Sequence, residues 1–303
     1  MPRHSAEMRR RRRRIQRIRS IAALTCVALL LVGCGILGGQ IVKETRRSKN
    51  LNSVKNLYGG STAYAEGNQA PAQPTATPVQ PEPTLVQPTA TPVPPVQDDF
   101  AGLLEQNAHL VAWLDAGSYI SLPVVQFDNE FYLDHDFYGS PDAAGTVFLN
   151  AVNSLWPPDQ HLLIHGHNMK DGSMFGMLRK YREPDWLRHN PIVYLRTLYD
   201  EQPTPYVVLS VFDASMDEGA DGYFDLGRIN FDTDEQFLAF GQELMDVSLY
   251  ESPLDVQPGD HLLSLVTCSY SHENGRLTVT CRALREGETV EDMTALMQQA
   301  YGR

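Results

Sequence analysis

Short runs of β-branched, aromatic and leucine residues alternate with turn-rich segments over the last two thirds of the chain. Seven such runs of four to nine residues can be distinguished: Tyr119–Gln126, Thr146–Leu149, His161–His165, Ile192–Leu198, Tyr206–Phe212, His261–Thr267 and Arg276–Leu284. Glycine, proline, asparagine and aspartate are frequent between them. Runs of this length with turn residues between them predict a β-rich core, either a barrel or a sandwich.

Four other segments have a helical pattern. Leucine and valine residues between Asp98 and Trp113 recur at three- and four-residue spacings, which predicts one or two short helices. Further helices are predicted at Met174–Tyr181, at Asp234–Leu249 and at Thr289–Tyr301. We therefore expect residues 98–303 to form one mainly β domain with helical additions, and this length is ample for a buried core.

A long apolar run near the N-terminus predicts a membrane anchor. Ile21–Val42 is 22 residues long, and its only clearly polar side chains are Thr25 and Gln40. As a helix it would extend ~33 Å, whereas the hydrocarbon core of a bilayer is ~30 Å thick. Residues 1–20 contain nine arginines, and basic residues concentrate on the cytoplasmic side of a membrane. We expect a cytoplasmic tip at 1–20, a single transmembrane helix at 21–42 and a folded body outside the cell.

Two other interpretations of this apolar run remain open. Leu31–Cys34 resembles a bacterial lipobox, in which the cysteine is lipidated and becomes the new N-terminus. The small residues of Gly33–Gly39 would also suit the cleavage site of a signal peptide, although the apolar run is long for one. All three interpretations place the body outside the cell.

The body is strongly acidic. Residues 98–303 contain 33 Asp and Glu against 11 Lys and Arg. Because nucleic acid is itself densely negative, this balance argues against nucleic acid as a partner. The arginine-rich tip adjoins the apolar run, so we assign it to membrane topology and not to nucleic-acid binding.

A proline-rich segment separates the apolar run from the body. Residues 71–95 contain nine prolines, and Gln-Pro-Thr-Ala-Thr-Pro-Val occurs at Gln73–Val79 and again at Gln87–Val93. Proline fixes φ and lacks a backbone donor, so such a stretch forms an extended spacer, which at ~3.1 Å per residue reaches ~75 Å. We expect residues 43–97 to be an extracellular linker, and a chain that starts at Asp98 to fold and function by itself.

Three predicted strand ends have side chains suited to acyl transfer. An apolar strand leads into His165 and His167, a second ends at Cys268, and a turn at Asn274 opens a third strand with Arg276. A thiol nucleophile needs a base or a cationic partner to form thiolate, and acyl transfer needs a donor where the oxyanion develops. Cysteine, histidine and arginine together provide these groups.

Other roles for the same residues remain open. Cys268 could be a buried small hydrophobe, or it could form a disulfide with Cys281. Side chains alternate along a strand, so if Arg276 faces Cys268, Cys281 points to the opposite face, which argues against the disulfide. His165 and His167 could share a face and bind zinc, but no third and fourth ligands at fixed spacing accompany them. Arg276 alone could be an ordinary surface arginine.

The body resembles a known family along nearly its whole length, from about Glu105 to Leu284. It is similar to the sortases, the extracellular cysteine transpeptidases of Gram-positive bacteria, and specifically to class B. The resemblance rests on these segments: Trp113-Leu114, Pro123–Gln126, Asp128–Leu133, Gly145–Leu149, Gly166–Phe175, Thr267-Cys268 and Arg276. The run His167-Asn168-Met169-Lys170-Asp171-Gly172-Ser173-Met174-Phe175 is the most specific of them.

The resemblance implies a fold and a mechanism. The fold would be the closed β-barrel of sortases with N-terminal helices and a long helix before the cysteine strand. Cys268 would be the nucleophile, His167 the catalytic histidine and Arg276 the arginine that holds the substrate carbonyl. The substrate would be a surface protein or pilin with a sorting signal, and the acceptor an amine of a cell-wall peptide or of a pilin lysine. No metal or organic cofactor is implied.

The chain departs from the usual family pattern at three positions. It has His165 where tyrosine is usual, Val266 where serine is usual and Asn150 where aspartate is common. None of these changes removes a catalytic group. Two other functions stay open at this point, a thiol protease that uses water as the acceptor and a non-enzymatic binding domain on a stalk.

Overall fold

The computed structural model describes residues 39, 41–58, 93–268 and 275–303. The chain divides into two compact units, Met1–Asn52 and Ser53–Arg303. The predicted tip at 1–20, nearly all of the predicted anchor at 21–42, Cys34 and most of the proline repeats lie outside the described residues. Among the helices of the described ranges, none is both long and apolar enough to cross a bilayer.

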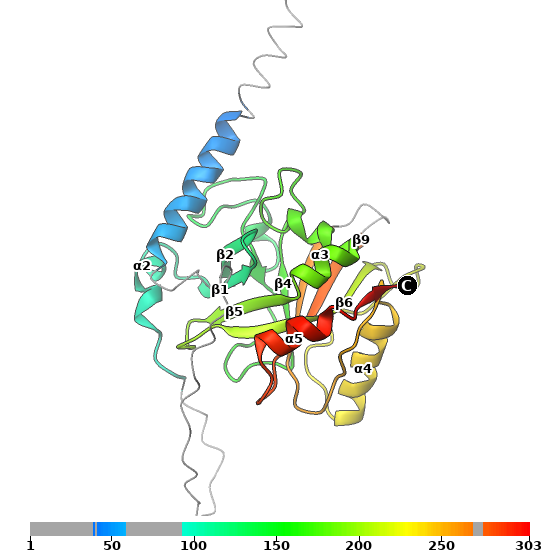
Figure 1. Cartoon of the computed structure of the whole chain (residues 1–303). Helices are drawn as coiled ribbons and strands as arrows, with labels where there is room; N and C mark the ends of the chain where they lie inside the picture. The colour runs from blue at the N-terminus through cyan, green and yellow to red at the C-terminus, as the bar shows by residue number, and fades with distance from the viewer. Residues whose placement is uncertain (1–38, 40, 59–92, 269–274) are drawn as a thin grey trace, which may run out of the picture. The chain divides into compact units, whose positions relative to one another are not determined.

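Eight strands close into a barrel, and hydrogen-bonded neighbours follow the order β1-β2-β3-β4-β8-β9-β6-β5. Figure 1 shows the strands together with the helices around them. The strands are β1 Leu110–Ala116, β2 Ile120–Val125, β3 Phe148–Leu149, β4 His161–His165, β5 Ile192–Thr197, β6 Thr204–Ser215, β8 Leu262–Cys268 and β9 Gly275–Ala283. Each of the seven predicted runs contributes one strand, and β1 is the eighth. Because the strand order closes on itself, the predicted barrel is confirmed and the sandwich is excluded. β2 runs parallel to β3 and β4 parallel to β8, whereas the other neighbouring pairs are antiparallel.

The helical prediction for Asp98–Trp113 is wrong over its second half. Helical residues end early, with a 3-10 helix η2 (Asp98–Phe100) and a short α2 (Ala101–Leu104). The Asn107 carboxamide then accepts the backbone N–H of His109 at 2.8 Å and turns the chain into β1. β1 is paired on both edges, with β2 and with β5. Its residues are nearly all buried, so the apolar spacing here reflects a strand covered on both faces.

The helix before the cysteine strand is present as α4 (Asp234–Asp246). Thr233 caps it by accepting the N–H of Gln236, and two acidic residues occupy its first turn, where they favour the helix dipole. Its buried side chains recur at the i, i+3, i+4 and i+7 spacing of an amphipathic helix: Phe237, Phe240, Gly241 and Leu244. α4 packs on β6, where the Ser210 hydroxyl donates to the Leu244 carbonyl at 2.5 Å.

The remaining elements are short. They are the 3-10 helices η3 (Phe131–Leu133) and η4 (Gly176–Arg182), the helices α3 (Pro184–His189) and α5 (Val290–Met297), and a small sheet of β7 (Tyr250–Glu251) and β10 (Tyr301–Gly302). The predicted helix at Met174–Tyr181 is therefore a 3-10 helix. α5 lies beside α3, and the Gln298 side chain that follows it donates to the Arg188 carbonyl at 2.8 Å.

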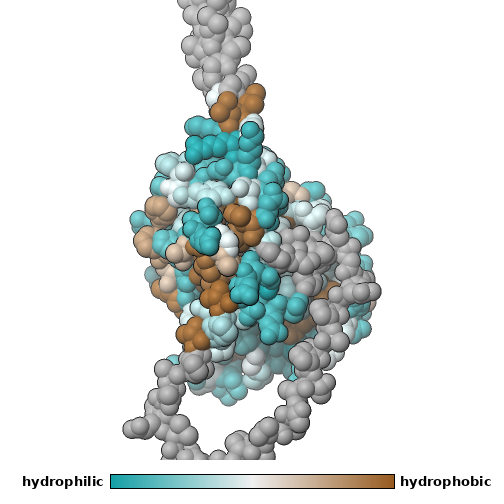
Figure 2. Space-filling model, turned by 90° about the vertical axis from the view of Figure 1, so that its left-hand side faces the viewer, coloured by the Kyte–Doolittle hydropathy of each residue, from teal (hydrophilic) through white to brown (hydrophobic). Residues whose placement is uncertain are grey.

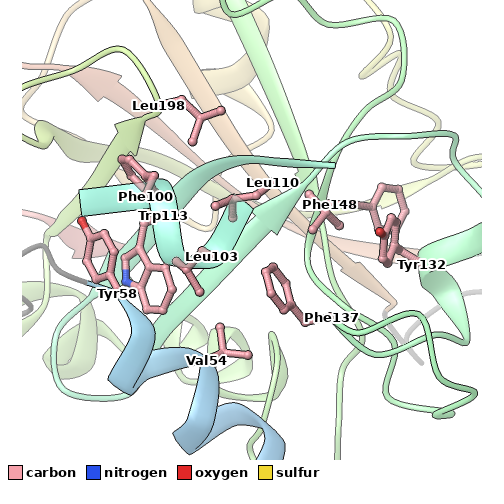
Figure 3. Packing of buried hydrophobic residues seen from close by; sticks show 11 residues of the cluster. Val54, Tyr58, Phe100, Leu103, Leu110, Trp113, Tyr132, Phe137, Phe148 and Leu198 are labelled. Carbon is pink, nitrogen blue, oxygen red and sulfur yellow. The ribbon is translucent and has the colours of Figure 1, made fainter. Parts of the chain in front are cut away.

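The linker expected at 43–97 differs from the structure at its beginning. Residues 41–57 are helical, and residues 53–58 belong to the same compact unit as the barrel. In that unit Val54 and Tyr58 are buried in an apolar cluster with Trp113 (Figure 3). The Tyr58 ring stacks on the Trp113 ring with 4.2 Å between centroids, and its hydroxyl accepts from Arg196 at 3.3 Å. The compact unit that contains the barrel therefore begins at Ser53, upstream of the Asp98 boundary predicted from the sequence.

Large apolar side chains are mostly buried in the barrel and beneath its helices. Those with more than a third of their surface exposed are spread over separate segments, for example Phe127, Val152 and Tyr301. On the face shown in Figure 2, apolar residues form small brown patches between hydrophilic ones. Scattered exposed apolar residues of this kind are normal for a folded domain.

Candidate active site

The backbone brings Cys268 and Arg276 together. β8 and β9 pair antiparallel, and Cys268 is the Cα partner of Arg276. The residues that connect these strand ends, 269–274, lie outside the described residues. The pairing therefore sets the predicted nucleophile and the predicted arginine opposite each other at one end of the barrel wall.

His167 reaches the same end of the wall from a neighbouring strand. β4 lies parallel to β8, with His165 beside Val266, and the Gly166 N–H donates to the Val266 carbonyl at 3.1 Å. His167 comes two residues after His165, just as Cys268 comes two residues after Val266. The three predicted site residues thus lie at the end of the barrel wall where β4 and β8 end and β9 begins.

The segment after β4, Gly166–Phe175, folds back on itself through close contacts that require particular residues. A Cβ atom at Gly166 would lie 2.8 Å from the Phe175 ring, so this ring can pack against the backbone only at a glycine. The Phe175 N–H donates to the His167 carbonyl at 2.9 Å, and Asn168 and Met174 form an isolated β-bridge. These contacts hold the backbone of the half-buried His167 in place.

Arg276 is half-buried, and one of its terminal nitrogens donates to the Gly275 carbonyl at 3.0 Å. Its positive charge acts on His165: burial and, after it, the Arg276 guanidinium lower the pKa of His165 to about 4. His165, the last residue of the strand that leads to His167, is therefore uncharged near neutral pH.

A second histidine of β4 has a structural role. His161 is fully buried, and its ring nitrogens contact the Arg228 carbonyl and the Ser264 hydroxyl, each at 2.8 Å. Burial lowers the pKa of His161 to about 4, so this side chain is a neutral part of the packing beneath α4, where it lies near Phe240. His161 thus takes no part in the candidate site.

The disulfide alternative is excluded. Cys281 is a free thiol and fully buried, and its partner across the β8–β9 ladder is Leu263, five residues from Cys268. Burial raises the pKa of the Cys281 thiol far above its ordinary value. As for zinc, the described part of the chain contains no group of three or more His, Cys, Asp and Glu side chains that could hold a metal ion.

One contact in this region is not evident from the sequence. Asn150 and His165, both of which depart from the usual family pattern, are hydrogen-bonded, with 3.2 Å between Asn150 Nδ2 and His165 Nε2. The contact depends on the pairing of β3 with β4, in which Phe148 lies opposite His165. A two-residue strand has too weak a sequence pattern to reveal that pairing in advance.

Comparison with known proteins agrees with this arrangement. No family model matches the chain. Sortase B of Listeria monocytogenes is 31% identical over 190 residues, which is 61% of this chain and 73% of the relative. Sortase B of Staphylococcus aureus is 26% identical over 194 residues, or 63% and 76% of the two chains.

The fold has a close counterpart among solved structures. The crystal structure of sortase B from Bacillus anthracis in complex with AAEK1 superimposes with a TM-score of 0.62 at 23% identity. The match covers 81% of this chain and all of that one. Given the identity and coverage of the Listeria relative and the shared barrel, this chain belongs to the sortase family and is of the class B type.

Proposed function

We propose that the chain is a membrane-anchored cysteine transpeptidase that cleaves a sorting signal after threonine and transfers the protein to an amine. The observation that carries the proposal is the pairing of Cys268 with Arg276 at the strand end beside the His167 turn. Membership of the sortase family supports the same reaction class. The roles of the three residues follow from their chemistry.

The reaction begins at the threonine carbonyl of the sorting signal. The Cys268 thiolate attacks the carbonyl carbon, and the negative charge moves to the oxygen, to which the Arg276 guanidinium donates hydrogen bonds. The C–N bond then breaks, and His167 gives a proton to the leaving amine. A thioester between Cys268 and threonine remains.

The second half of the reaction reverses these roles. His167 removes a proton from the incoming amine, which attacks the thioester carbon while Arg276 again stabilises the oxyanion. The C–S bond breaks and the Cys268 thiolate is regenerated. The product is an amide between the threonine and the acceptor, and no external oxidant or cofactor enters the balance.

The location and the partners are part of the proposal. The arginine-rich residues 1–20 and the apolar run 21–42 support a single membrane span with a cytoplasmic N-terminus and an extracellular barrel. The sortase B of Staphylococcus aureus has been solved as a substrate complex, and for this chain the proposed substrate is a protein with a sorting signal. The proposed acceptor is an amine of the cell wall or of a pilin lysine.

A peptide assay tests the proposed function. The purified protein is incubated with sorting-signal peptides, with and without a primary amine, and the products are identified by mass spectrometry. We expect an amide adduct between the threonine fragment and the amine. A thiol protease would give the free acid in both reactions, and a binding domain would give no cleavage, so either result would contradict the proposal.

Arg276→Lys should lower kcat/KM by ~100- to 1,000-fold, the usual effect of losing one oxyanion donor. Lysine keeps the positive charge but not the planar, paired donors of a guanidinium. The matched control is Arg188→Lys, because Arg188 pairs with the exposed Asp185 on α3 and is not one of the proposed catalytic residues. Turnover close to normal in Arg276→Lys would show that Arg276 does not contact the reacting carbonyl.

A further inference from the structure

Asn150 and His165 form a hydrogen-bonded pair next to the proposed catalytic residues. Asn150 directly follows β3 and His165 ends β4, and Asn150 Nδ2 lies 3.2 Å from His165 Nε2. The His165 ring also stacks on Phe148, with 5.2 Å between centroids. These two contacts fix the imidazole two residues before His167.

The direction of the hydrogen bond follows from the other contacts of the Asn150 carboxamide. Its Oδ1 accepts the backbone N–H of Val152 at 3.2 Å and the Asn129 side-chain nitrogen at 3.3 Å. The Asn129 carboxamide is oriented in turn, because its oxygen accepts the N–H of Ala151 at 2.8 Å. Asn150 therefore presents its NH2 group to His165. Since that group only donates, Nε2 must be the unprotonated acceptor, and a neutral His165 has its proton on Nδ1.

The groups around His165 disfavour a positive charge on its ring in addition to the charge of Arg276. β3 and the residue after it contribute Phe148 and Asn150, and β8 contributes Val266, all of them uncharged. Among the described residues, Arg276 of β9 is a charged group that acts on the ring, and the titratable His167 follows two residues later on the same segment. Burial and this guanidinium oppose protonation in the same direction, and both would have to be overcome to form an imidazolium.

We propose that Asn150 and His165 are positioning residues, which keep an uncharged imidazole with its proton on Nδ1 at the end of β4, one strand away from the paired Cys268 and Arg276. The inference rests on the proposed function, in which Arg276 holds the threonine carbonyl oxygen. A neutral ring packs against the site without displacing the guanidinium. An imidazolium would repel it from the place where the oxyanion develops.

Asn150→Asp reverses this one hydrogen bond with little change in shape. One carboxylate oxygen can still accept hydrogen bonds from Val152 and Asn129. The other can accept a hydrogen bond from a protonated Nε2 and thereby stabilises the charged ring. We therefore expect the midpoint of His165 titration to rise by about two pH units or more in the variant. Nitrogen-15 NMR of the ring is the measurement. In the unsubstituted protein it should show the Nδ1–H tautomer from about pH 6 to 9.

The same titration should appear in the activity of the variant. We expect kcat/KM of Asn150→Asp to fall about tenfold as the pH drops through the midpoint seen by NMR, the effect of one pKa unit of unfavourable interaction. The unsubstituted protein should lack this step. Adding His165→Tyr to Asn150→Asp should rescue activity on the acid side, because a tyrosine at this position remains uncharged there.

Each outcome decides the proposal. An Nε2–H tautomer in the unsubstituted protein, or His165 titration near the ordinary histidine value, would overturn it. A pH step that survives in the double variant would also overturn it. If Asn150→Asp does not fold, as judged by thermal unfolding, the tautomer in the unsubstituted protein decides. If amine transfer is absent at every pH, the proposed function fails, whereas the NMR result still decides on the pair.

Discussion

Cys268→Ala should abolish both peptide cleavage and amine transfer, with a loss in kcat/KM of at least ~1,000-fold. Alanine fits a strand end but offers no nucleophile, so the thioester cannot form. The other cysteine of the described residues cannot replace it. Cys281 is fully buried, and its thiol has a strongly raised pKa, so it supplies no thiolate near neutral pH. The measurement is peptide turnover with and without an amine.

Two controls separate chemistry from folding in this experiment. Cys281→Ala should keep most of the transfer activity, because its thiol lies in the barrel packing, and its cost should appear mainly in thermal unfolding. A thiol-reactive probe on the folded protein should label Cys268 well before Cys281. Equal labelling of the two cysteines, or transfer that survives in Cys268→Ala, would refute the assignment of the nucleophile.

The strands of the barrel could be predicted because their patterns are local. His161–His165 is a strand with the bounds that its apolar run indicates. The run at Ile192 is one residue longer than β5 at one end, and the run at His261 is shifted by one residue from β8 at both ends. β1 could not be predicted in the same way. It is buried on both faces, so its residues show no alternation, and their spacing also matches a helix. Pairing with β2 and β5 decides its conformation.

The residue types of the site could be predicted, but their mutual geometry could not. Cysteine, histidine and arginine at strand ends indicated acyl transfer, and the run from His167 to Phe175 indicated the family. The sequence alone does not show that β8 and β9 are neighbours. The structure pairs them with Cys268 opposite Arg276. The orientation of Asn150 depends on backbone N–H groups in the loop after β3, which no side-chain pattern encodes.

The sequence does not reveal that the compact unit of the barrel begins at Ser53, because the helix at residues 41–57 is mostly polar. Of residues 53–58, Val54 and Tyr58 are buried, and a pair of apolar residues in a charged segment followed by proline repeats looks like linker. Tyr58 nevertheless contacts three parts of the body: it stacks on Trp113, packs near Phe100 and accepts from Arg196. Arg196 is in turn paired with Asp99 at 2.7 Å.

A chain that starts at Asp98 should therefore be much less stable than one that starts at Asn50. Loss of a buried aromatic side chain costs about 3–5 kcal/mol, and for a body of this size each kcal/mol lowers the unfolding midpoint by about 2–4 °C. We expect a decrease of about 10 °C or more, measured by thermal unfolding, with a parallel loss of peptide turnover at 37 °C.

Point substitutions in the longer chain locate the cause of this loss. Tyr58→Ala should reproduce most of the decrease, whereas Tyr58→Phe should keep the stack on Trp113 and lose only the hydrogen bond from Arg196, a change of about 1 kcal/mol. Leu57→Ala is the matched control, because Leu57 is adjacent in sequence but exposed. Equal midpoints for the chains that start at Asn50 and at Asp98 would show that residues 53–58 add nothing to the fold. The folded body would then begin at Asp98.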